Sequence, residues 1–291
     1  MIALIKKWIL LSLELGKIRI TFSVTITTAI GYLLVDAPRT SHIVWPVLGI
    51  LLIGLSSAAL NQLQDRKLDA KMSRTKHRPL PSGRVKPLHV VIFILMYLIA
   101  GLAILVLKTN WIATALGLSA FIWYNGFYTY LKRISPIAVI PGSVIGGVPP
   151  GVGWAAAGGD ILDPFILAVC FFMFIWQIPH FWLLLFLYGD DYEKAGLPTL
   201  IKRTSEKTLG YLTFAGIFIT ALSALAIPLA GQIYIKAVWV ALIVVSIGIL
   251  WLSRNLLFPS KTVNYKKTFI AINIYSVLVL FVVFSMTLIH S

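Results

Sequence analysis

Long apolar segments with almost no internal charge dominate the chain. Nine of them cover most of the 291 positions, at roughly 18–36, 42–63, 88–107, 110–130, 136–157, 164–187, 209–229, 233–253 and 267–289. A helix of about 20 apolar residues crosses the ~30 Å hydrocarbon core of a bilayer. A transmembrane β-barrel would instead show short stretches in which apolar and polar residues alternate. The sequence therefore predicts an all-α, polytopic membrane protein with nine transmembrane helices.

The composition supports this class and excludes others. Apolar residues make up 59% of the chain and charged residues 12%, which is about half the charged share of an ordinary soluble domain. The polar residues are too few to cover a soluble fold, and the one cysteine, Cys170, cannot form an internal disulfide. These facts exclude a soluble enzyme, a disordered chain and a disulfide scaffold. No segment between the spans is long enough for a soluble domain, so we expect one integral membrane domain over residues 1–291.

The basic residues lie almost entirely in alternate loops. If the N-terminus is on the first side, 22 of the 25 basic residues fall on that side, and only Arg39, Lys108 and Lys236 fall on the other. Cytoplasmic loops carry such an excess of Lys and Arg. We therefore expect a multi-pass protein of the cell membrane with a cytoplasmic N-terminus and an external C-terminus. Topology, with the bilayer as partner, accounts for the net charge of +15, so nucleic acid is excluded as a partner.

The end of the second span carries the most informative polar residues. Asn61, Asp65 and Asp69 follow one another at i, i+4 and i+8, so a helix stacks them along one face. Side-chain oxygens of this kind suit a hard cation such as Mg²⁺. The basic residues that follow, Arg74, Lys76, Arg78 and Arg84, would complete a site for a metal-bound diphosphate. The alternative is an ordinary solvated cytoplasmic loop.

A second polar cluster follows the sixth span, on the same predicted side of the membrane. Asp190 and Asp191 would face the first cluster and hold a second metal ion, or would merely flank a helix end. His180 precedes Asp190 by ten residues, which places it roughly 15 Å deeper in a helix. Ionisable groups at such depth usually line a cavity. His180 is therefore either a functional residue, able to ligate a haem iron or carry a proton, or a satisfied structural histidine.

Several motifs resemble those of one known family. The row Asn61-x-x-x-Asp65-x-x-x-Asp69 is similar to the first aspartate motif of the UbiA superfamily of intramembrane prenyltransferases. Five further motifs resemble its haem branch, the protohaem IX farnesyltransferases: Asp69-x-x-Met72-x-Arg74-Thr75-x-x-Arg78-Pro79-Leu80, Tyr128-Thr129-x-x-Lys132-Arg133, Gly147-x-Pro149-Pro150-x-x-Gly153-Trp154, Ile175-Trp176-Gln177-Ile178-Pro179-His180-Phe181 and Asp191-Tyr192-x-x-Ala195-Gly196-x-Pro198. The matches extend from about residue 60 to residue 200.

The resemblance implies a UbiA-type helical bundle that converts farnesyl diphosphate, haem B and water into haem O and diphosphate. It implies Mg²⁺ as cofactor, with Asn61, Asp65, Asp69, Asp191 and Asp190 as candidate ligands. It implies Arg74, Lys76, Arg78, Lys132 and Arg133 as diphosphate-binding residues, and His180 as the residue that binds haem. Asp65, Asp69, Asp191 and His180 are the expected catalytic residues. Proteins of haem-copper oxidase biogenesis are implied as partners.

The chain also departs from the family pattern. The second aspartate motif of the superfamily is usually Asp-x-x-x-Asp, whereas this chain has Tyr188-x-x-x-Tyr192 near that register, as the haem branch tends to. Lys17-Ile18-Arg19 replaces a common Lys-Pro, and Thr199-Leu200-Ile201-Lys202 replaces a common Met-Leu-Pro-Val. These changes leave open a UbiA-type transfer to another aromatic, quinone-precursor or lipid acceptor. A transporter is the remaining alternative, but it would require ionisable residues along a path through the membrane.

Overall fold

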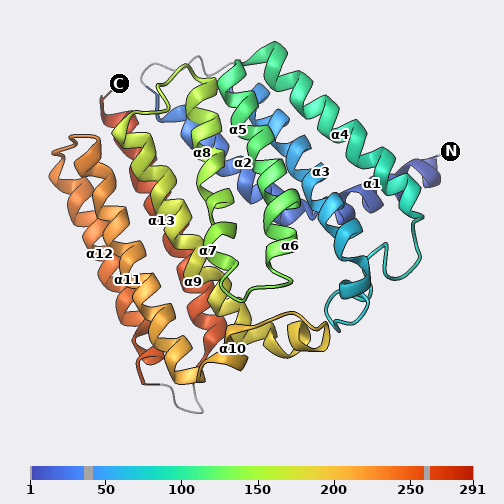
Figure 1. Ribbon diagram of the computed structural model, residues 1–291. Helices are drawn as coiled ribbons and strands as arrows, with labels where there is room; N and C mark the ends of the chain where they lie inside the picture. Colours follow the sequence, from blue (N-terminus) through green and yellow to red (C-terminus); the bar gives the residue numbers. More distant parts are fainter. Residues whose placement is uncertain (1, 36–41, 259–262, 291) are drawn as a thin grey trace.

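The computed structural model describes residues 2–35, 42–258 and 263–290, and all regular structure in these ranges is helical (Figure 1). The predicted outer residue Arg39 lies outside the described residues. Within these described ranges, six helices are long and apolar enough to cross a membrane: α3 (Val44–Asp69), α4 (Pro87–Lys108), α9 (Pro164–Lys194), α11 (Glu206–Ala230), α12 (Lys236–Ser253) and α13 (Tyr265–His290). The all-α, multi-pass class predicted from the sequence is therefore confirmed.

The other three predicted spans are shorter or interrupted. The first corresponds to α2 (Ile18–Leu33), which has 16 residues. The fourth is divided into α5 (Trp111–Ile122), a π-helical turn η2 (Trp123–Tyr128) and α6 (Thr129–Leu131). The fifth is divided into α7 (Val139–Gly142) and α8 (Val144–Ala156). The count of nine spans is thus not confirmed, because hydropathy detects apolar length but not a break in the helix.

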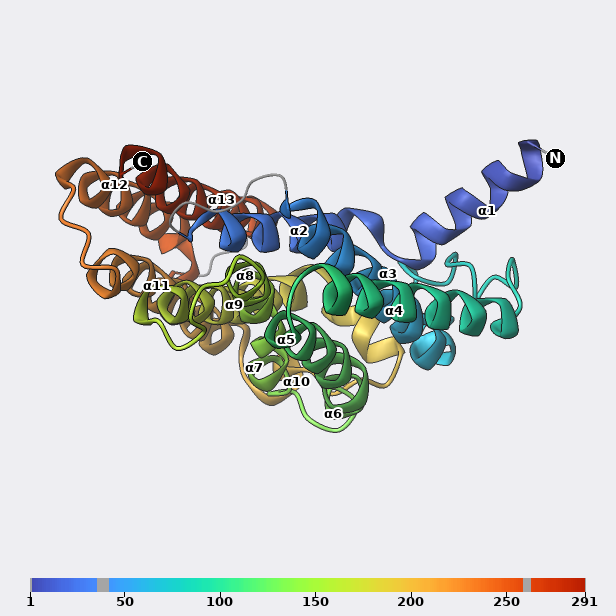
Figure 2. The same ribbon diagram turned by 90° about the horizontal axis from the view of Figure 1, so that it is seen from above.

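The remaining helices lie outside the predicted spans. The N-terminal helix α1 (Ile2–Leu15) extends away from the bundle (Figure 2). The short helix α10 (Leu200–Arg203) follows α9, and a 3₁₀ turn η3 (Arg254–Leu256) follows α12. Bulky apolar side chains on the outside of the bundle, such as Leu95, Met96 and Ile99 of α4, are more than half exposed. Lipid tails are an apolar solvent, so such a surface is stable in a bilayer and not in water.

The helices α2 and α8 pack so closely that only glycine fits at their contact. A Cβ atom on Gly153 would lie 1.9 Å from the carbonyl oxygen of Thr28, and one on Gly31 would lie 2.0 Å from that of Pro150. Small residues allow membrane helices to approach in this way. The close contact with α2 therefore explains Pro150 and Gly153 of the motif Gly147-x-Pro149-Pro150-x-x-Gly153.

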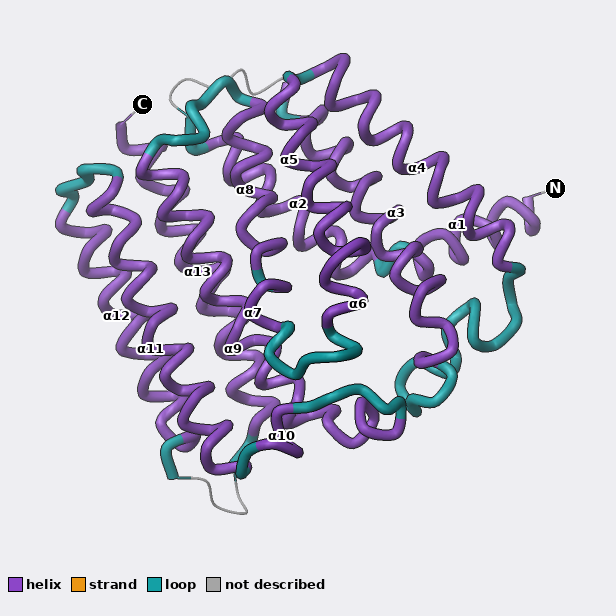
Figure 3. The backbone as a smooth tube through the Cα atoms, viewed as in Figure 1, coloured by secondary structure: helices purple, strands orange, loops and turns teal. Residues whose placement is uncertain are grey.

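Three polar segments meet at one end of the bundle. They are the loop that follows α3, the loop between α6 and α7, and the end of α9 with the segment that follows it (Figure 3). The two polar clusters predicted to share one side of the membrane are indeed adjacent, because the carboxylate of Asp191 contacts Ser73. This end of the bundle contains the candidate site.

Candidate active site

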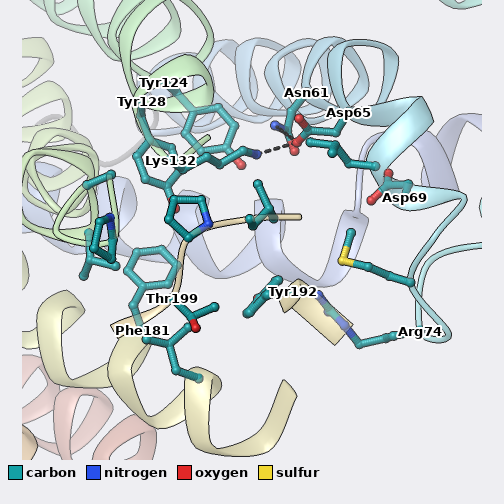
Figure 4. A pocket seen from close by; sticks show the side chains of 18 of the residues that line it. Asn61, Asp65, Asp69, Arg74, Tyr124, Tyr128, Lys132, Phe181, Tyr192 and Thr199 are labelled. Atoms are coloured by element: carbon teal, nitrogen blue, oxygen red, sulfur yellow. Dashed lines mark hydrogen bonds and ion pairs between the residues drawn. The ribbon is translucent and has the colours of Figure 1, made fainter. Parts of the chain in front are cut away.

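A cavity of about 250 Å³ opens at this end of the bundle, enclosed by α3, the start of α2, η2, α9 and the segment after α9. Charged and amide side chains line one part of it: Lys17, Asn61, Asp65, Asp69, Arg74, Arg78 and Lys132. Aromatic rings line another part: Tyr124, Tyr128, Phe181 and Tyr192 (Figure 4). Binding cavities for drug-sized ligands start at about 300 Å³. The cavity therefore accommodates a diphosphate and part of an apolar chain, and it must widen to admit a large second substrate.

The first motif lies along one face of α3, as its spacing predicts. Asn61, Asp65 and Asp69 all line the cavity, and each is at most 5% exposed. Their position at the end of α3 places buried oxygen atoms near the polar end of the bundle (Figure 4). Buried carboxylates are stable only when they are paired or hydrogen-bonded.

Basic side chains from other segments provide that pairing. Asp65 forms ion pairs with Lys132 and with Arg133, whose Nη2 lies 2.9 Å from Asp65 Oδ1. Arg78 Nη1 donates to both oxygens of Asp69 at 2.8 Å. Each carboxylate of the first motif therefore has a cationic partner that itself lies at or beside the cavity.

Asn61 links this cluster to two further segments. Its Nδ2 donates to Asp65 Oδ2 at 2.9 Å and to Thr129 Oγ1 at 3.3 Å. Its Oδ1 accepts a hydrogen bond from Lys17 Nζ at 3.1 Å. The amide thus fixes the orientation of Asp65 and connects α3 with α6 and with the start of α2.

Lys17 is a site residue that the sequence analysis did not single out. It has a left-handed backbone with φ of 49°, which non-glycine residues seldom adopt, and this conformation directs the side chain to the cavity. Burial, together with the charges of Arg78 and Lys132, lowers the pKa of Lys17 to about 7. The signal in the sequence was a single lysine directly before the first span, and the predicted topology already accounted for that lysine.

The π-helical turn η2 positions the aromatic and basic side chains of the cavity wall. Thr129 Oγ1 donates to the carbonyl of Tyr124 at 2.8 Å, and Asn125 Nδ2 donates to Ser57 Oγ of α3 at 2.7 Å. Tyr124, Tyr128 and Lys132 then line the cavity together. Single π turns of this kind occur frequently at functional sites.

The second cluster is arranged differently from the first. Asp191 is 8% exposed but does not line the cavity, and its oxygens accept hydrogen bonds from Ser73 and from the backbone of Arg74. Asp190 is exposed and also lies outside the cavity lining. Tyr192, one of the two tyrosines in the register of the second motif, does line it.

His180 lies on the side of α9 that faces α13. Its ring centroid is 4.8 Å from that of Trp176 and 4.9 Å from that of Phe269 on α13. Its Nδ1 is buried and has no hydrogen-bond partner among the described residues. The adjacent Phe181 lines the cavity, so His180 borders the site without opening into it.

The structure therefore gathers most, but not all, of the predicted site residues. Those that line the cavity are Asn61, Asp65, Asp69, Arg74, Arg78 and Lys132, and Arg133 reaches it through Asp65. Those that do not line it are Lys76, which is exposed, together with Asp190, Asp191 and His180. In the described part of the chain, no three His, Cys, Asp or Glu side chains form a metal-binding group. The oxygens of Asn61, Asp65 and Asp69 nevertheless fit a hard cation, provided that the basic partners shift.

The model of the UbiA prenyltransferase family matches residues 24–286. The chain belongs to that family. Two curated relatives are similar over most of its length. It is 35% identical to a protoheme IX farnesyltransferase of Methylococcus capsulatus over 233 residues, which cover 77% of each chain. It is 36% identical to protoheme IX farnesyltransferase 1 of Pseudomonas paraeruginosa, with 77% of this chain and 76% of the relative covered.

Solved structures of UbiA-type proteins share the fold. A digeranylgeranylglyceryl phosphate synthase superimposes with a TM-score of 0.76 at 18% identity, over 96% of this chain and 98% of that one. A UbiA homologue from Archaeoglobus fulgidus bound to GPP and Mg²⁺ gives a TM-score of 0.66 at 16% identity, over 94% and 98% of the two chains. At these identities the likeness establishes the UbiA-type architecture of this chain and not its substrate.

Proposed function

We propose that this protein transfers the farnesyl group of farnesyl diphosphate to haem B and so produces haem O. The observation that carries the proposal is one cavity lined by Asn61, Asp65 and Asp69, by the basic residues Lys17, Arg78 and Lys132, and by aromatic rings. The similarity to farnesyltransferases over 77% of the chain supports haem as the acceptor in preference to a quinone precursor or a lipid.

The basic side chains bind the diphosphate. Arg74, Arg78, Lys132 and Lys17 line one cavity, so several cations can contact one anion. Guanidinium groups form paired hydrogen bonds to phosphate oxygens, and charge-assisted bonds of this kind are the strong ones. Donors fixed in advance around the leaving group favour cleavage of the allylic C1–O bond.

The carboxylates of α3 would hold Mg²⁺. When bound, Mg²⁺ supplies positive charge that stabilises the departing diphosphate. Arg78 and Lys132 pair with Asp69 and Asp65 in the structure, and these basic side chains would turn to phosphate oxygens when a diphosphate binds, which would leave the carboxylates available to hold the metal. Before the substrate binds, the ion pairs thereby hold both the carboxylates of α3 and their basic partners in place.

The aromatic wall protects the farnesyl group. Tyr124, Tyr128 and Phe181 line the part of the cavity that continues from the charged end into the bundle. Ring faces attract a cation, and an apolar lining keeps water from the allylic cation until the acceptor reacts. A haem vinyl carbon then bonds to C1 of the farnesyl group, and water adds to the resulting haem cation and loses a proton, which gives the hydroxyethylfarnesyl product.

His180 would orient the haem. It lies one residue before Phe181 of the cavity wall, and its buried Nδ1 has no partner among the described residues. A neutral imidazole can ligate iron or hydrogen-bond at the reacting edge. Extension of the cavity past Phe181 toward the contact between α9 and α13 would expose this atom to the second substrate.

We place the active end of the bundle at the cytoplasmic side, with an external C-terminus, because the loops at this end are strongly basic. Proteins of haem-copper oxidase biogenesis would then receive the product. A reporter inserted near Ser82 should be cytoplasmic and one fused after residue 291 should be external. Both reporters on the same side would contradict this orientation.

Mass spectrometry of haems provides the direct test of the function. Cells that contain the chain should accumulate haem O, and cells without it should contain haem B alone. Purified protein in nanodiscs should convert haem B only when farnesyl diphosphate and Mg²⁺ are both present. Prenylation of another acceptor, with no haem product and no haem binding, would overturn the proposal.

A further inference from the structure

Near the register of the second acidic motif of the superfamily, this chain has the two tyrosines Tyr188 and Tyr192. Tyr188 has a non-helical backbone, with φ of −138° and ψ of 15°, so α9 is kinked four residues before Tyr192. Asp191 is the nearest buried acid, and its carboxylate is turned toward the loop after α3. The end of α9 therefore presents no carboxylate to the cavity within the described residues.

The contacts of Asp191 use both of its oxygens. Ser73 Oγ donates to Oδ1 at 2.6 Å and to Oδ2 at 2.8 Å, and the backbone N–H groups of Ser73 and Arg74 donate to the same carboxylate at 3.3 and 3.1 Å. A carboxylate that accepts two successive backbone N–H groups fixes the local backbone conformation. Asp191 thus connects the end of α9 to the loop after α3, across 118 residues of sequence.

Arg74, whose backbone N–H group donates to Asp191, directs its side chain to the cavity. Arg74 lines the cavity, and its guanidinium carbon lies 4.8 Å from the ring centroid of Tyr188. A guanidinium over an aromatic face is attracted to it, which favours this orientation of Arg74. Arg74 is therefore fixed twice by the end of α9, at its backbone by Asp191 and at its guanidinium by Tyr188.

We propose that Asp191 is a positioning residue for Arg74 and not a metal ligand, and that Arg74, stacked on Tyr188, supplies the positive charge that a metal ion held by a second acidic motif would supply. The assignment rests on the proposed function, because it needs a diphosphate in the cavity. Asn61, Asp65 and Asp69 then form the only acidic metal site that the described residues build here. Arg74 binds the diphosphate from the opposite side.

Substitutions at three positions separate this assignment from metal ligation. Asp191→Asn loses the charge and one acceptor, and Ser73→Ala loses the hydroxyl partner without touching an acid. Tyr188→Leu removes the ring beneath Arg74, whereas Tyr188→Phe keeps the ring and removes only the hydroxyl. Ser82→Ala is the matched control, because the Ser82 hydroxyl bonds within the same loop and not to α9.

The experiment uses the full chain in nanodiscs, with inorganic diphosphate and Mn²⁺ as probes. Calorimetry gives the Kd for diphosphate, electron paramagnetic resonance counts bound Mn²⁺, and hydrogen exchange reports on the peptide 70–80. We expect Asp191→Asn to raise the Kd about tenfold and Ser73→Ala about threefold, with the same Mn²⁺ stoichiometry as the wild type. In the double variant Asp191→Asn/Ser73→Ala, the rise in the Kd should be smaller than the two single effects combined, because both substitutions remove the same contact.

Hydrogen exchange and the two variants of Tyr188 complete the test. Exchange in the peptide 70–80 should accelerate in Asp191→Asn and Ser73→Ala but not in Ser82→Ala. Tyr188→Leu should weaken diphosphate binding about as much as Ser73→Ala, and Tyr188→Phe should restore it to the wild-type value. A Tyr188→Phe variant as weak as Tyr188→Leu would show that the hydroxyl is required, which contradicts the assignment.

Two results would overturn the proposal in different ways. Loss of one bound Mn²⁺ in Asp191→Asn, together with wild-type behaviour of Ser73→Ala, would make Asp191 a metal ligand while the proposed function stands. No metal-dependent binding of diphosphate by the wild type would overturn the proposed function itself, and this assignment with it.

Discussion

The ends of α3 and α9 form two walls of one cavity but use their acidic residues in opposite ways. On α3, Asp65 and Asp69 face the cavity and are paired with basic side chains from other segments. On α9, Asp191 faces away from it and holds a neighbouring loop in place. An aspartate near an active site thus has a role that depends on where its oxygens point, which spacing in a sequence does not reveal.

The contacts of these aspartates also differ in whether they can change when substrate binds. The α3 carboxylates are held by side chains that can turn to another anion, so their contacts are exchangeable when substrate binds. The contacts of Asp191 include two backbone N–H groups, which cannot turn away without moving the loop. We therefore expect substitution of the α3 carboxylates to abolish turnover and substitution of Asp191 to reduce the affinity for diphosphate.

The strongest test of this comparison is Asp65→Asn or Asp69→Asn. Each removes a carboxylate that faces the cavity and leaves basic partners without their counter-charge, so turnover should fall more than about thousandfold. Haem O formation by purified protein provides the measurement, and a preserved melting temperature shows that the fold survives. The comparison fails if Asp191→Asn causes an equally large loss of turnover, or if both single variants on α3 remain active.

Substitution of His180 extends the comparison of the α3 and α9 walls from the charged end of the cavity to the interior of the helical bundle. His180→Ala should reduce haem O formation roughly 10- to 100-fold because the acceptor loses its orientation, while diphosphate binding is unchanged. Titration of haem with detection of the Soret band measures the first effect, and calorimetry with diphosphate measures the second. His89→Ala is a suitable control, since His89 packs against Trp8 and does not line the cavity. Wild-type activity and an unchanged Soret band would leave His180 as a packing residue between Trp176 and Phe269.

Lys17 offers a third test, at the start of α2. Lys17→Met removes a cation that lines the cavity and bonds to Asn61, so the KM for farnesyl diphosphate should rise about tenfold. Arg19→Met removes an exposed charge two residues away and should leave the KM unchanged. Equal effects of the two substitutions would mean that Lys17 acts only through the net charge of the loop.

The first motif and the class of the fold could be predicted from the sequence, because both depend on short-range patterns. Apolar runs of the length of a bilayer indicate helices, and a row at i, i+4 and i+8 places three side chains on one helical face. The pairing of Asp65 with Lys132 could not be predicted in this way, since 67 residues separate them. That pair depends on how α3 and α6 pack.

Breaks in helices were the other feature that the sequence analysis missed. The π turn at residues 123–128 lies inside the apolar segment 110–130, which a hydropathy window treats as continuous, and the kink at Tyr188 directly follows the apolar segment 164–187. The two breaks position Tyr124, Tyr128 and Arg74 at the site. The left-handed conformation of Lys17 is likewise invisible in the sequence, because it depends on the link between α1 and α2.

The smallest effect on substrate affinity is expected at Arg84, in the loop after α3 that Asp191 holds at Ser73 and Arg74. Arg84 forms a forked ion pair with Glu14 of α1, at 2.9 and 2.5 Å, and this pair raises the pKa of Arg84. Both side chains are more than 40% exposed, and exposed pairs contribute at most about 1 kcal/mol. Arg84→Ala should therefore raise the KM for farnesyl diphosphate less than about threefold, which is less than the effect of Asp191→Asn.

Parallel measurement of the two variants compares a buried attachment of the loop with an exposed one. High salt should weaken the effect of Arg84→Ala, because salt screens exposed charges, and should leave that of Asp191→Asn nearly intact. If Arg84→Ala impairs binding as strongly as Asp191→Asn at every salt concentration, α1 positions Arg74 as much as α9 does. The contrast between the α3 and α9 walls would then have to include α1 as a third support of the site.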